Sequence, residues 1–345
     1  MAALNFSDFT DLIRENYGDL IVSTLVQSGP GNEIVPEQSI LGCLRQAGRV
    51  VIGGADSNDR YAREWAVHYA TATAISYGAS DNYPNATQES FDDASIDWKR
   101  VGVMMSYDEL VRAASSRMDT RGGNFISYDL KSKLRAIVDK ISDDLATDGS
   151  GNSNKDVTGF KAFLSAGNTY ASIDQSANSW WQAVVDSTGG NLSKSLVEGV
   201  IESLDARNAL KPGLQIWMAY NQWNRWKNLF VDDIRRIENR NTSEGFEMVY
   251  EDGNVSIPIK LIRNIPNTEV WFPNVNDIEV RFLDQTPSDE LDEMDLSEEM
   301  TYEGMPIGFK PVYENRDVTN IFCRAWVNAV CSNPYHQAVL TGLNV

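Results

Sequence analysis

The sequence predicts an α+β protein of two lobes, in which helices and largely antiparallel strands alternate irregularly. Three observations support this prediction. The chain has 345 residues, which is long for a single compact domain. A long amphipathic helix is predicted near its middle. Short runs of β-branched and aromatic residues on both sides of this helix predict strands, without the regular succession of a strand-helix-strand fold.

The long helix is predicted from Ile126 to Leu145, because apolar residues recur there every three or four positions. These positions are Ile126, Leu130, Leu134, Ile137, Val138, Ile141 and Leu145. A helix of this length is a rod of about 33 Å. It is expected to end at residues 148–151, where Gly149 and Gly151 are predicted to form a flexible hinge between the lobes.

The first part of the chain predicts an arm. It begins with a short amphipathic pattern formed by Phe6, Phe9, Leu12 and Ile13. A Gly-Pro-Gly run at 29–31 then breaks the chain, and the segment contains too little apolar surface to form a core. An arm of this kind needs another surface to lie on.

A two-stranded hairpin is predicted next. Its strands are expected at 64–77 and 96–106, and the loop at 78–93 is rich in Asn, Asp, Ser and Pro. A hairpin with so polar a tip is not stable alone, so it either packs on a neighbouring subunit or stays mobile.

The part that follows the long helix predicts a second lobe. Ser193 is a suitable N-cap for a helix, and a second helix carries Trp223 and Trp226. Strands are expected at 214–220, 256–262, 269–272, 278–283 and 317–331. An acidic excursion at 286–304 interrupts them.

Composition excludes several classes of protein. The hydrophobic fraction of 42% with nine Trp is sufficient for a packed core. A net charge of -19 argues against tight binding of nucleic acid, because affinity for its phosphates comes chiefly from clustered Lys and Arg. No apolar run reaches the length of about 18 residues that a membrane helix needs, and the N-terminus lacks a secretory pattern. A soluble protein that stays where it is made is therefore expected.

The three cysteines are expected to be reduced thiols. Cys323 and Cys331 lie on one predicted strand, about 26 Å apart, which is beyond the reach of a disulfide. Three cysteines also form no even-numbered disulfide framework.

No catalytic, cofactor-binding or metal-binding residue is predicted, and the chain is not expected to be an enzyme. The two histidines, His68 and His336, have no motif around them and are assigned structural roles. The loop 148–156 lacks the Gly and Glu positions of a calcium-binding EF-hand. The acidic residues of 289–303 are expected to be solvated; a divalent-ion site or a contact with a basic patch of another subunit is the alternative.

The order of these parts resembles that of the major capsid proteins of tailed bacteriophages, with the Hong Kong 97-like fold. Five segments carry the resemblance, at 98–110, 144–149, 158–164, 217–223 and 331–334. Segment 98–110 resembles the strand that leaves an extended loop, and segment 144–149 resembles the end of a spine helix. Segment 158–164 contains the Gly159-Phe160 pair, which is similar to the start of the family's axial domain. Segment 331–334 contains Asn333-Pro334, which resembles the close after the final strand.

The resemblance implies five parts. These are an N-terminal arm (1–55), an extended β-hairpin loop (56–106), a peripheral domain with the spine helix (107–155), an axial domain (156–265) and return strands to the peripheral domain (266–345), with the acidic excursion at 286–304. It also implies assembly as hexamers and pentamers into an icosahedral shell around double-stranded DNA, held without sequence-specific binding and without a membrane. The expected location is the virion, after assembly in the host cytoplasm.

The resemblance further implies partners. A portal protein is expected, and scaffolding is expected to be a separate protein because the arm begins almost at Met1. The strength of the shell is expected to come either from non-covalent overlap or from a separate cementing protein. In some relatives, the subunits of the shell are cross-linked by an isopeptide bond from a lysine in the extended loop. This chain has no lysine before Lys99, so such a cross-link is not expected.

Two alternatives remain at this point. An encapsulin-like compartment that houses a cargo enzyme shares the fold. A carbohydrate-active or carbohydrate-binding protein is the alternative from another class, suggested only by the many Trp, Tyr and carboxylate residues.

Overall fold

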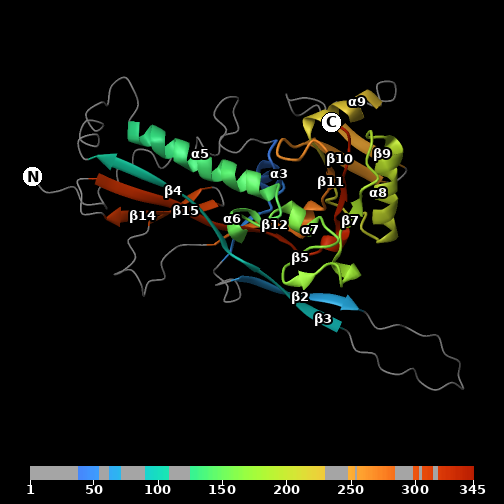
Figure 1. Cartoon of the computed structure of the whole chain (residues 1–345), viewed down its shortest axis with the longest axis horizontal. Helices are drawn as coiled ribbons and strands as arrows, with labels where there is room; N and C mark the ends of the chain where they lie inside the picture. Colours follow the sequence, from blue (N-terminus) through green and yellow to red (C-terminus); the bar gives the residue numbers. More distant parts are fainter. Residues whose placement is uncertain are drawn as a thin grey trace, which may run out of the picture.

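The computed structural model describes residues 38–53, 62–70, 90–108, 125–229, 248–252, 255–283, 298–302, 305–313 and 318–345. The described part is an α+β subunit with two sheets of six strands each and a separate hairpin (Figure 1). The predicted fold class is confirmed. No helix among these residues combines the length and the apolar content that would cross a membrane.

The first sheet is long and narrow. Its strand order is β1 (Val50–Gly53), β12 (Ile278–Leu283), β15 (Val318–Cys331), β14 (Met305–Tyr313) and β13 (Glu298–Tyr302), and β4 (Lys99–Asp108) also pairs with β15. β1 runs parallel to β12, and the other pairs are antiparallel. β15 is the shared axis of this sheet, because three strands pair with it.

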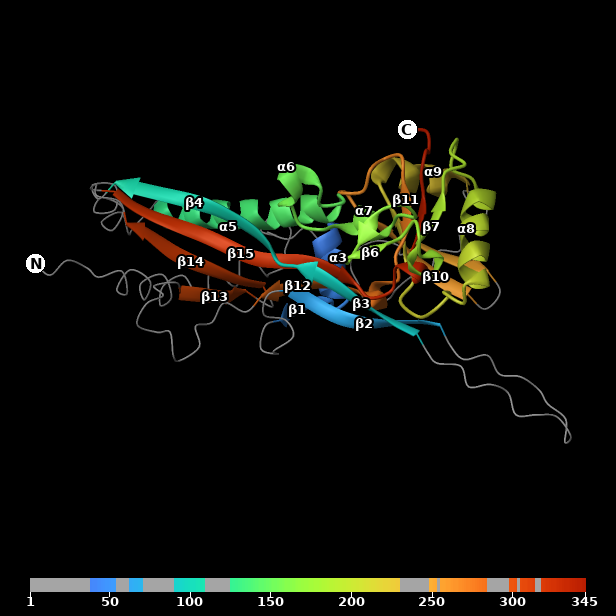
Figure 2. The same cartoon turned by 60° about the horizontal axis from the view of Figure 1, so that its bottom comes forward.

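The long helix α5 (Phe125–Leu145) lies along β4 and β15, as both views show (Figures 1 and 2). The prediction of this helix is confirmed. Its large apolar residues from Leu134 onward are at most 2% exposed, namely Leu134, Ile137, Val138, Ile141 and Leu145. They meet the alternate residues of β15 that face inward, namely Ile321, Cys323, Ala325 and Val327. The apolar face of α5, which repeats about every 3.6 residues, thus packs against the inward face of β15, which repeats every two residues.

The second sheet forms the other lobe. Its order is β7 (Val184–Asp186), β16 (Ala338–Leu340), β11 (Val270–Phe272), β8 (Ile216–Met218), β10 (Val255–Leu261) and β9 (Met248–Asp252). Helix α8 (Lys194–Ala206) packs on β16 and β7, and α9 (Tyr220–Leu229) packs on β8. Ser193 caps α8, and its hydroxyl accepts a hydrogen bond from the Leu196 amide, as predicted.

The chain after residue 265 is shared between the two sheets. β12 to β15 belong to the long sheet, but β11 and β16 pair inside the second sheet. The expectation that all of 266–345 returns to the peripheral domain is therefore wrong for these two strands. Each has three consecutive buried residues, which is the pattern of an inner strand covered on both faces.

The hairpin consists of β2 (Ala62–Ala70) and β3 (Ser90–Asp97). The strand expected at 96–106 is wrong as a single element, because the chain changes partner at Trp98. β3 pairs with β2, whereas β4 pairs with β15 from Lys99 to Asp108. One face of the hairpin packs on the body through Trp65 and Val67. The segment 71–89, which contains most of the predicted polar loop, lies outside the described residues.

Residues 38–53 are not part of a free arm. Helix α3 (Ile40–Gln46) packs against α5 and β12, and four of its residues are at most 1% exposed. These are Ile40, Leu41, Cys43 and Leu44. Strand β1 extends the long sheet. The predicted arm of 1–55 is therefore wrong at its C-terminal end, because this apolar cluster is buried in the subunit's own core. Residues 1–37 lie outside the described residues.

The acidic excursion is also shorter than predicted. Residues 298–302 form β13, which pairs with β14 in the long sheet. Residues 284–297 and 303–304, with most of the carboxylates, lie outside the described residues.

Candidate assembly surfaces and the subunit junction

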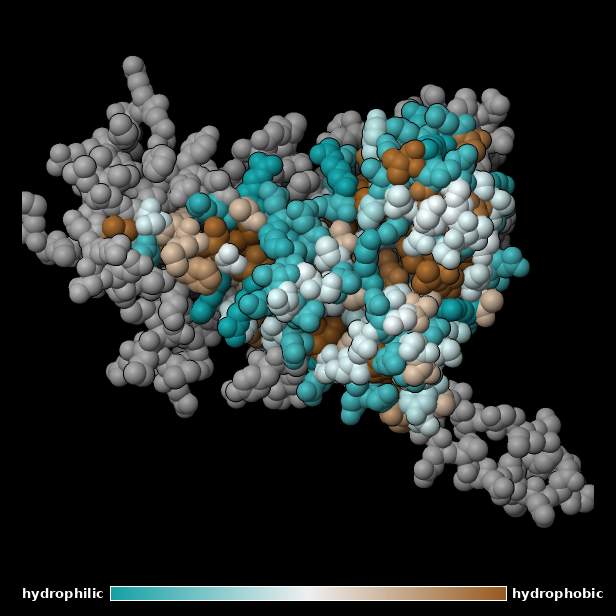
Figure 3. Space-filling model, viewed as in Figure 1, coloured by the Kyte–Doolittle hydropathy of each residue, from teal (hydrophilic) through white to brown (hydrophobic). Residues whose placement is uncertain are grey.

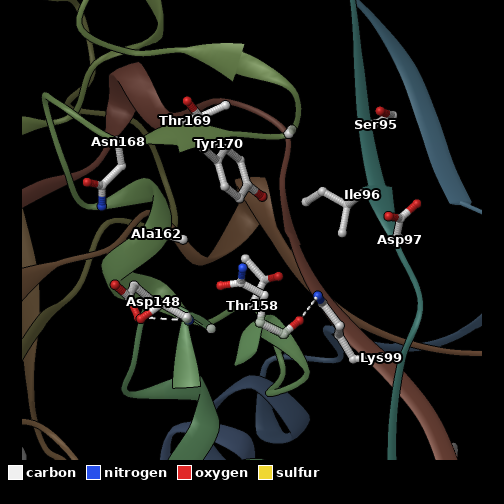
Figure 4. Close-up of a pocket in the computed structure, with 14 residues that line it drawn as sticks. Ser95, Ile96, Asp97, Lys99, Asp148, Thr158, Ala162, Asn168, Thr169 and Tyr170 are labelled. Atoms are coloured by element: carbon white, nitrogen blue, oxygen red, sulfur yellow. Dashed lines mark hydrogen bonds between the residues drawn. The ribbon is translucent and has the colours of Figure 1, made fainter. Parts of the chain in front are cut away.

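Four segments meet where the two lobes join. They are the hairpin root (95–99), the end of α5, the connection 146–159 and β15, which are joined by hydrogen bonds. Figure 4 shows the root beside the connection. We call this place the junction. It holds the hairpin, the long helix and the second sheet in one arrangement, so its side chains decide the shape of the subunit.

Asn328 of β15 is the central side chain of the junction and is 2% exposed. Its carbonyl oxygen accepts a hydrogen bond from the Thr158 amide at 2.9 Å. Its amide nitrogen donates to the Asp97 carbonyl at 2.6 Å and to the Thr158 hydroxyl at 3.3 Å. One buried amide thus connects β15, the hairpin root and the connection after α5.

Asp144, in the last turn of α5, binds the segment 146–159 that follows the helix. Its side chain is 4% exposed and accepts from the Lys140 ammonium at 2.6 Å and from the Val157 amide at 3.4 Å. Lys140 also contacts Asp156 at 3.1 Å. Burial raises the pKa of Asp144 above its ordinary value, although Lys140 acts in the opposite direction. The pKa of Lys140 is raised, chiefly by its hydrogen bond to Asp144.

The connection after α5 is closely packed. At Gly149, whose φ is +79°, a Cβ would lie 2.8 Å from the Thr158 Cα. A Cβ at Gly159 would lie within 2.5 Å of the Leu145 carbonyl oxygen and would also collide with those of Asp144 and Thr147. The flexible hinge expected at Gly149 and Gly151 stays a prediction; the positive φ of Gly149 and its contact with Thr158 leave no room for a side chain there.

Asp148 stabilises this turn and has no ligand-binding geometry. Its carboxylate accepts from the Ser150 amide at 3.0 Å and from the Ser150 hydroxyl at 2.7 Å. These bonds lower the pKa of Asp148. Such a local turn agrees with the interpretation of 148–156 as a helix stop.

Phe160 connects the junction to the second sheet. It begins α7 (Phe160–Phe163), is fully buried, and its ring lies 5.2 Å from Trp217 of β8 and 5.4 Å from Trp271 of β11. The Gly159-Phe160 pair singled out in the sequence thus has a physical reason. The glycine lets the chain touch the end of α5, and the aromatic ring fills the space between the lobes.

The histidines and cysteines make ordinary structural contacts. His68 on β2 packs on Phe91 at 4.9 Å, and His336 contacts Asp277 at 2.8 Å. The three cysteines are free thiols, as predicted, and the structure places all three in the interior. Within the described ranges, no group of three His, Cys, Asp or Glu residues could hold a metal ion.

Large apolar side chains are exposed on every described part of the subunit. They lie on the hairpin (Tyr69 and Phe91), on the long sheet (Ile52 and Met104) and on the second lobe (Val185, Tyr220, Leu229 and Val345). Phe91 is 61% exposed and Tyr220 is 60% exposed. In Figure 3 the apolar residues form separate patches among hydrophilic ones. Apolar side chains scattered singly over a surface are ordinary, so these residues do not by themselves define an interface.

The junction residues were missed in the sequence, although one of them left a signal. Asp144 follows Ile137 and Ile141 by seven and three residues, so it falls on the apolar stripe of α5. A carboxylate at such a position indicates a buried polar contact. Asn328 left no signal, because in the strand alternation it follows Arg324 and Trp326, which are half-exposed, and an Asn is ordinary on such a face.

The protein thus combines two lobes, a long helix along a narrow sheet and a projecting hairpin. No protein-family model and no curated protein matches the sequence. Solved structures do match. The capsid subunit of cyanophage A-1(L) aligns with a TM-score of 0.67 and 14% identity, covering 87% of this chain and 92% of that one.

The capsid of Myoviridae phage XM1 aligns with a TM-score of 0.51 and 11% identity, covering 87% and 92%. The SrpI encapsulin of Synechococcus elongatus PCC 7942 aligns with a TM-score of 0.52 and 8% identity, covering 94% and 95%. The fold is therefore the Hong Kong 97-like capsid fold.

The raised pKa of Asp144 predicts a pH dependence. In the folded state this carboxyl binds its proton more tightly than in the unfolded chain, where the reference pKa is 3.8. Its contribution to the free energy of unfolding therefore increases as pH falls through the raised pKa. Urea unfolding of the wild type and of Asp144→Asn at pH 7 and at about pH 4 measures this. The wild type should gain stability relative to the variant at the lower pH, and a relative loss there would contradict the assignment.

Proposed function

We propose that the chain is the major capsid protein of a tailed bacteriophage, a structural subunit without enzymatic activity. The observation that carries this proposal is the alignment with a cyanophage capsid subunit, which covers 87% of this chain and 92% of that one. The apolar side chains exposed on the hairpin, the long sheet and the second lobe are available for contacts between subunits.

The subunits assemble as hexamers and pentamers into an icosahedral shell. The second lobe, from about residue 156, is the axial part that surrounds the capsomer axis, and its exposed residues include Val185 and Tyr220. The arm and the hairpin lie on neighbouring subunits, where Tyr69 and Phe91 become buried. Burial between chains completes the stability of these parts.

The shell encloses double-stranded DNA without reading its sequence. The net charge of -19 limits adhesion of the wall to phosphates. A separate scaffolding protein, a portal and a cementing protein are the further partners, and assembly in the host cytoplasm leads to the virion.

An encapsulin-like compartment is the second candidate. It is supported by the alignment with the SrpI encapsulin, which covers 94% of this chain. The two candidates share the shell and differ in its contents, which are DNA in one case and a cargo protein in the other.

The contents of purified particles distinguish these candidates. The chain is produced in cells together with the genes that lie next to its own gene. The purified particles are treated with nuclease, disrupted, and analysed for DNA and for co-purified proteins. Nuclease-protected double-stranded DNA supports the phage capsid. An abundant enzyme without protected DNA supports the compartment. A monodisperse monomer that hydrolyses a sugar would contradict both.

The shell is expected to be held by non-covalent contacts. The chain has no lysine before Lys99, and the Lys99 ammonium donates to the Asn154 carbonyl of its own chain at 2.6 Å. Denatured particles should therefore give a single band at 38.5 kDa. A ladder of larger bands, with isopeptide-linked peptides found by mass spectrometry, would contradict this prediction.

A further inference from the structure

Residues 318–345 contribute strands to both sheets. β15 lies in the long sheet and β16 lies in the second sheet, so this part of the chain, drawn in red, runs from one lobe into the other (Figure 1). We call residues 318–345 the closing segment. Every other described residue precedes it in the chain and is therefore synthesised before it.

In the long sheet, β15 joins strands that are otherwise separate. β4, β12 and β14 each pair with β15, and β4 has no other partner among the described strands. Without β15, the ladders of this sheet would be reduced to the pair of β1 with β12 and the pair of β13 with β14. Two-stranded pairs of this kind are marginally stable in water. The buried face of α5 would also lose the strand against which it packs.

In the second sheet, β16 lies between β7 and β11. It runs parallel to β7 and antiparallel to β11, and β7 has no other partner among the described strands. Helix α8 packs on the same two strands, β16 and β7. Ala338 and Leu340 are 0% exposed, and they lie in the core of this lobe together with Leu343. β7 and α8 are therefore held in the second lobe chiefly through β16.

The residues beyond β16 bind further parts of the same lobe. The Leu343 amide donates to the Thr268 carbonyl at 3.0 Å, and the Asn344 amide donates to the Gly190 carbonyl at 2.8 Å. The Asn344 carbonyl accepts from the side-chain amide of Gln222 at 2.8 Å. Gln222 belongs to α9 and is 0% exposed, so this bond is made inside the lobe. The closing segment thus connects α9 and the segment after β7 to the sheet.

The pairing of the closing segment differs from the usual order of folding during synthesis. Domains generally fold as units, with the N-terminal one first. Here both lobes need strands that are made late, because Lys99 of β4 pairs with Val327 and Val184 of β7 pairs with Ala338. Contacts across such separations form only after the later strand has been made. Neither sheet therefore reaches its observed strand order before the closing segment has been synthesised.

We propose that the closing segment makes entry into a shell conditional on synthesis through its last strand. A chain that stops before residue 318 lacks an inner strand of both sheets. A chain that stops before β16 forms the long sheet but leaves β7 and α8 without their place in the second lobe. Nascent and truncated chains are thus excluded from the shell. This consequence rests on the proposed function, whereas the dependence of the second lobe on β16 does not.

Hydrogen exchange in the unassembled subunit tests the dependence on β16. A chain that stops after Asn333 keeps β15 and loses η5 (Pro334–His336) and β16. We expect the amides of β7 and α8 to exchange about 100-fold faster or more than in the 345-residue chain. The amides that pair β15 with β4 should stay protected. Unchanged protection of β7 and α8, or an equal loss in β15, would overturn the proposal.

A substitution in β16 gives the same test without shortening the chain. Leu340→Lys places a charge where the native side chain is 0% exposed, and it should accelerate exchange in β7 and α8 as the truncation does. The matched control is Val345→Lys, which adds the same charge at a residue that is 67% exposed and should leave exchange unchanged. Acceleration of equal size in both variants would contradict a specific role of β16.

Co-expression tests the consequence for the shell. The 345-residue chain and the chain that stops after Asn333 are produced together, and mass spectrometry compares their ratio in purified particles with their ratio in the cell. We expect the shorter chain to be depleted from particles by about 10-fold or more, which corresponds to about 1.4 kcal/mol. Incorporation in proportion to expression would overturn the proposal. If the longer chain forms no particles, the proposed function fails, and hydrogen exchange still decides the role of β16.

Discussion

Gly159→Ala is expected to lower the free energy of unfolding of the subunit by about 3 kcal/mol. The added methyl group would lie within 2.5 Å of the Leu145 carbonyl oxygen and would also collide with those of Asp144 and Thr147. These are backbone atoms at the end of α5, so no side chain can rotate away. The φ of Gly159 is -104°, which alanine adopts without strain, and the loss therefore reports the close approach alone.

The matched control is Gly199→Ala in α8. No atom lies within 4 Å of a Cβ placed there, and the residue is inside a helix. Alanine should stabilise the subunit by roughly 0.5–1 kcal/mol, because it restricts the unfolded chain and favours the helix. Urea unfolding of both variants, followed by circular dichroism, measures the two effects. Similar stability of Gly159→Ala and the wild type would contradict the closed junction.

Asn328→Ala is expected to lower the free energy of unfolding by roughly 2–4 kcal/mol. The substitution leaves the Thr158 amide without its acceptor and the Asp97 carbonyl without its donor. It also opens a small space in a site where Asn328 is 2% exposed. Buried polar groups that lose a partner cost more than the hydrogen bond itself contributes.

The control for this variant is Ser332→Ala, just beyond the end of β15. The Ser332 hydroxyl makes a single exposed hydrogen bond of 3.2 Å to the Asp277 carbonyl. Its loss should change the stability by less than about 0.5 kcal/mol. Hydrogen exchange adds a local readout, because Asn328→Ala should accelerate exchange of the Thr158 amide more than that of amides in α8. Uniform acceleration in both places would argue against a specific role in the junction.

Sequence patterns predict well the long elements, in which the same apolar pattern is repeated many times on one face. The α5 helix and the strand ending at Cys331 fall within one residue of their predicted positions, because seven apolar positions and strict alternation mark them. The strand predicted at 96–106 is wrong because two adjacent strand-forming segments form one continuous pattern. Only the pairing of β4 with β15, more than 200 residues away, separates them.

The junction could not be predicted from local patterns for a similar reason. Gly149 resembles a flexible position in the sequence, and only its contact with Thr158 shows why it lacks a side chain. The contact of Gly159 with the end of α5 likewise leaves no sign in the sequence. The Asn328 amide bonds to Asp97 and Thr158, which are distant in the chain. The apolar cluster of α3 falls within the predicted arm because seven residues alone cannot show which core they enter.

The central claim is that this subunit assembles with copies of itself into a closed shell. Electron microscopy of the purified protein, produced with and without a co-expressed scaffolding protein, tests this claim most directly. We expect hollow icosahedral particles, or rings of five and six subunits when scaffolding is absent. A preparation that contains only monomers under both conditions would contradict it.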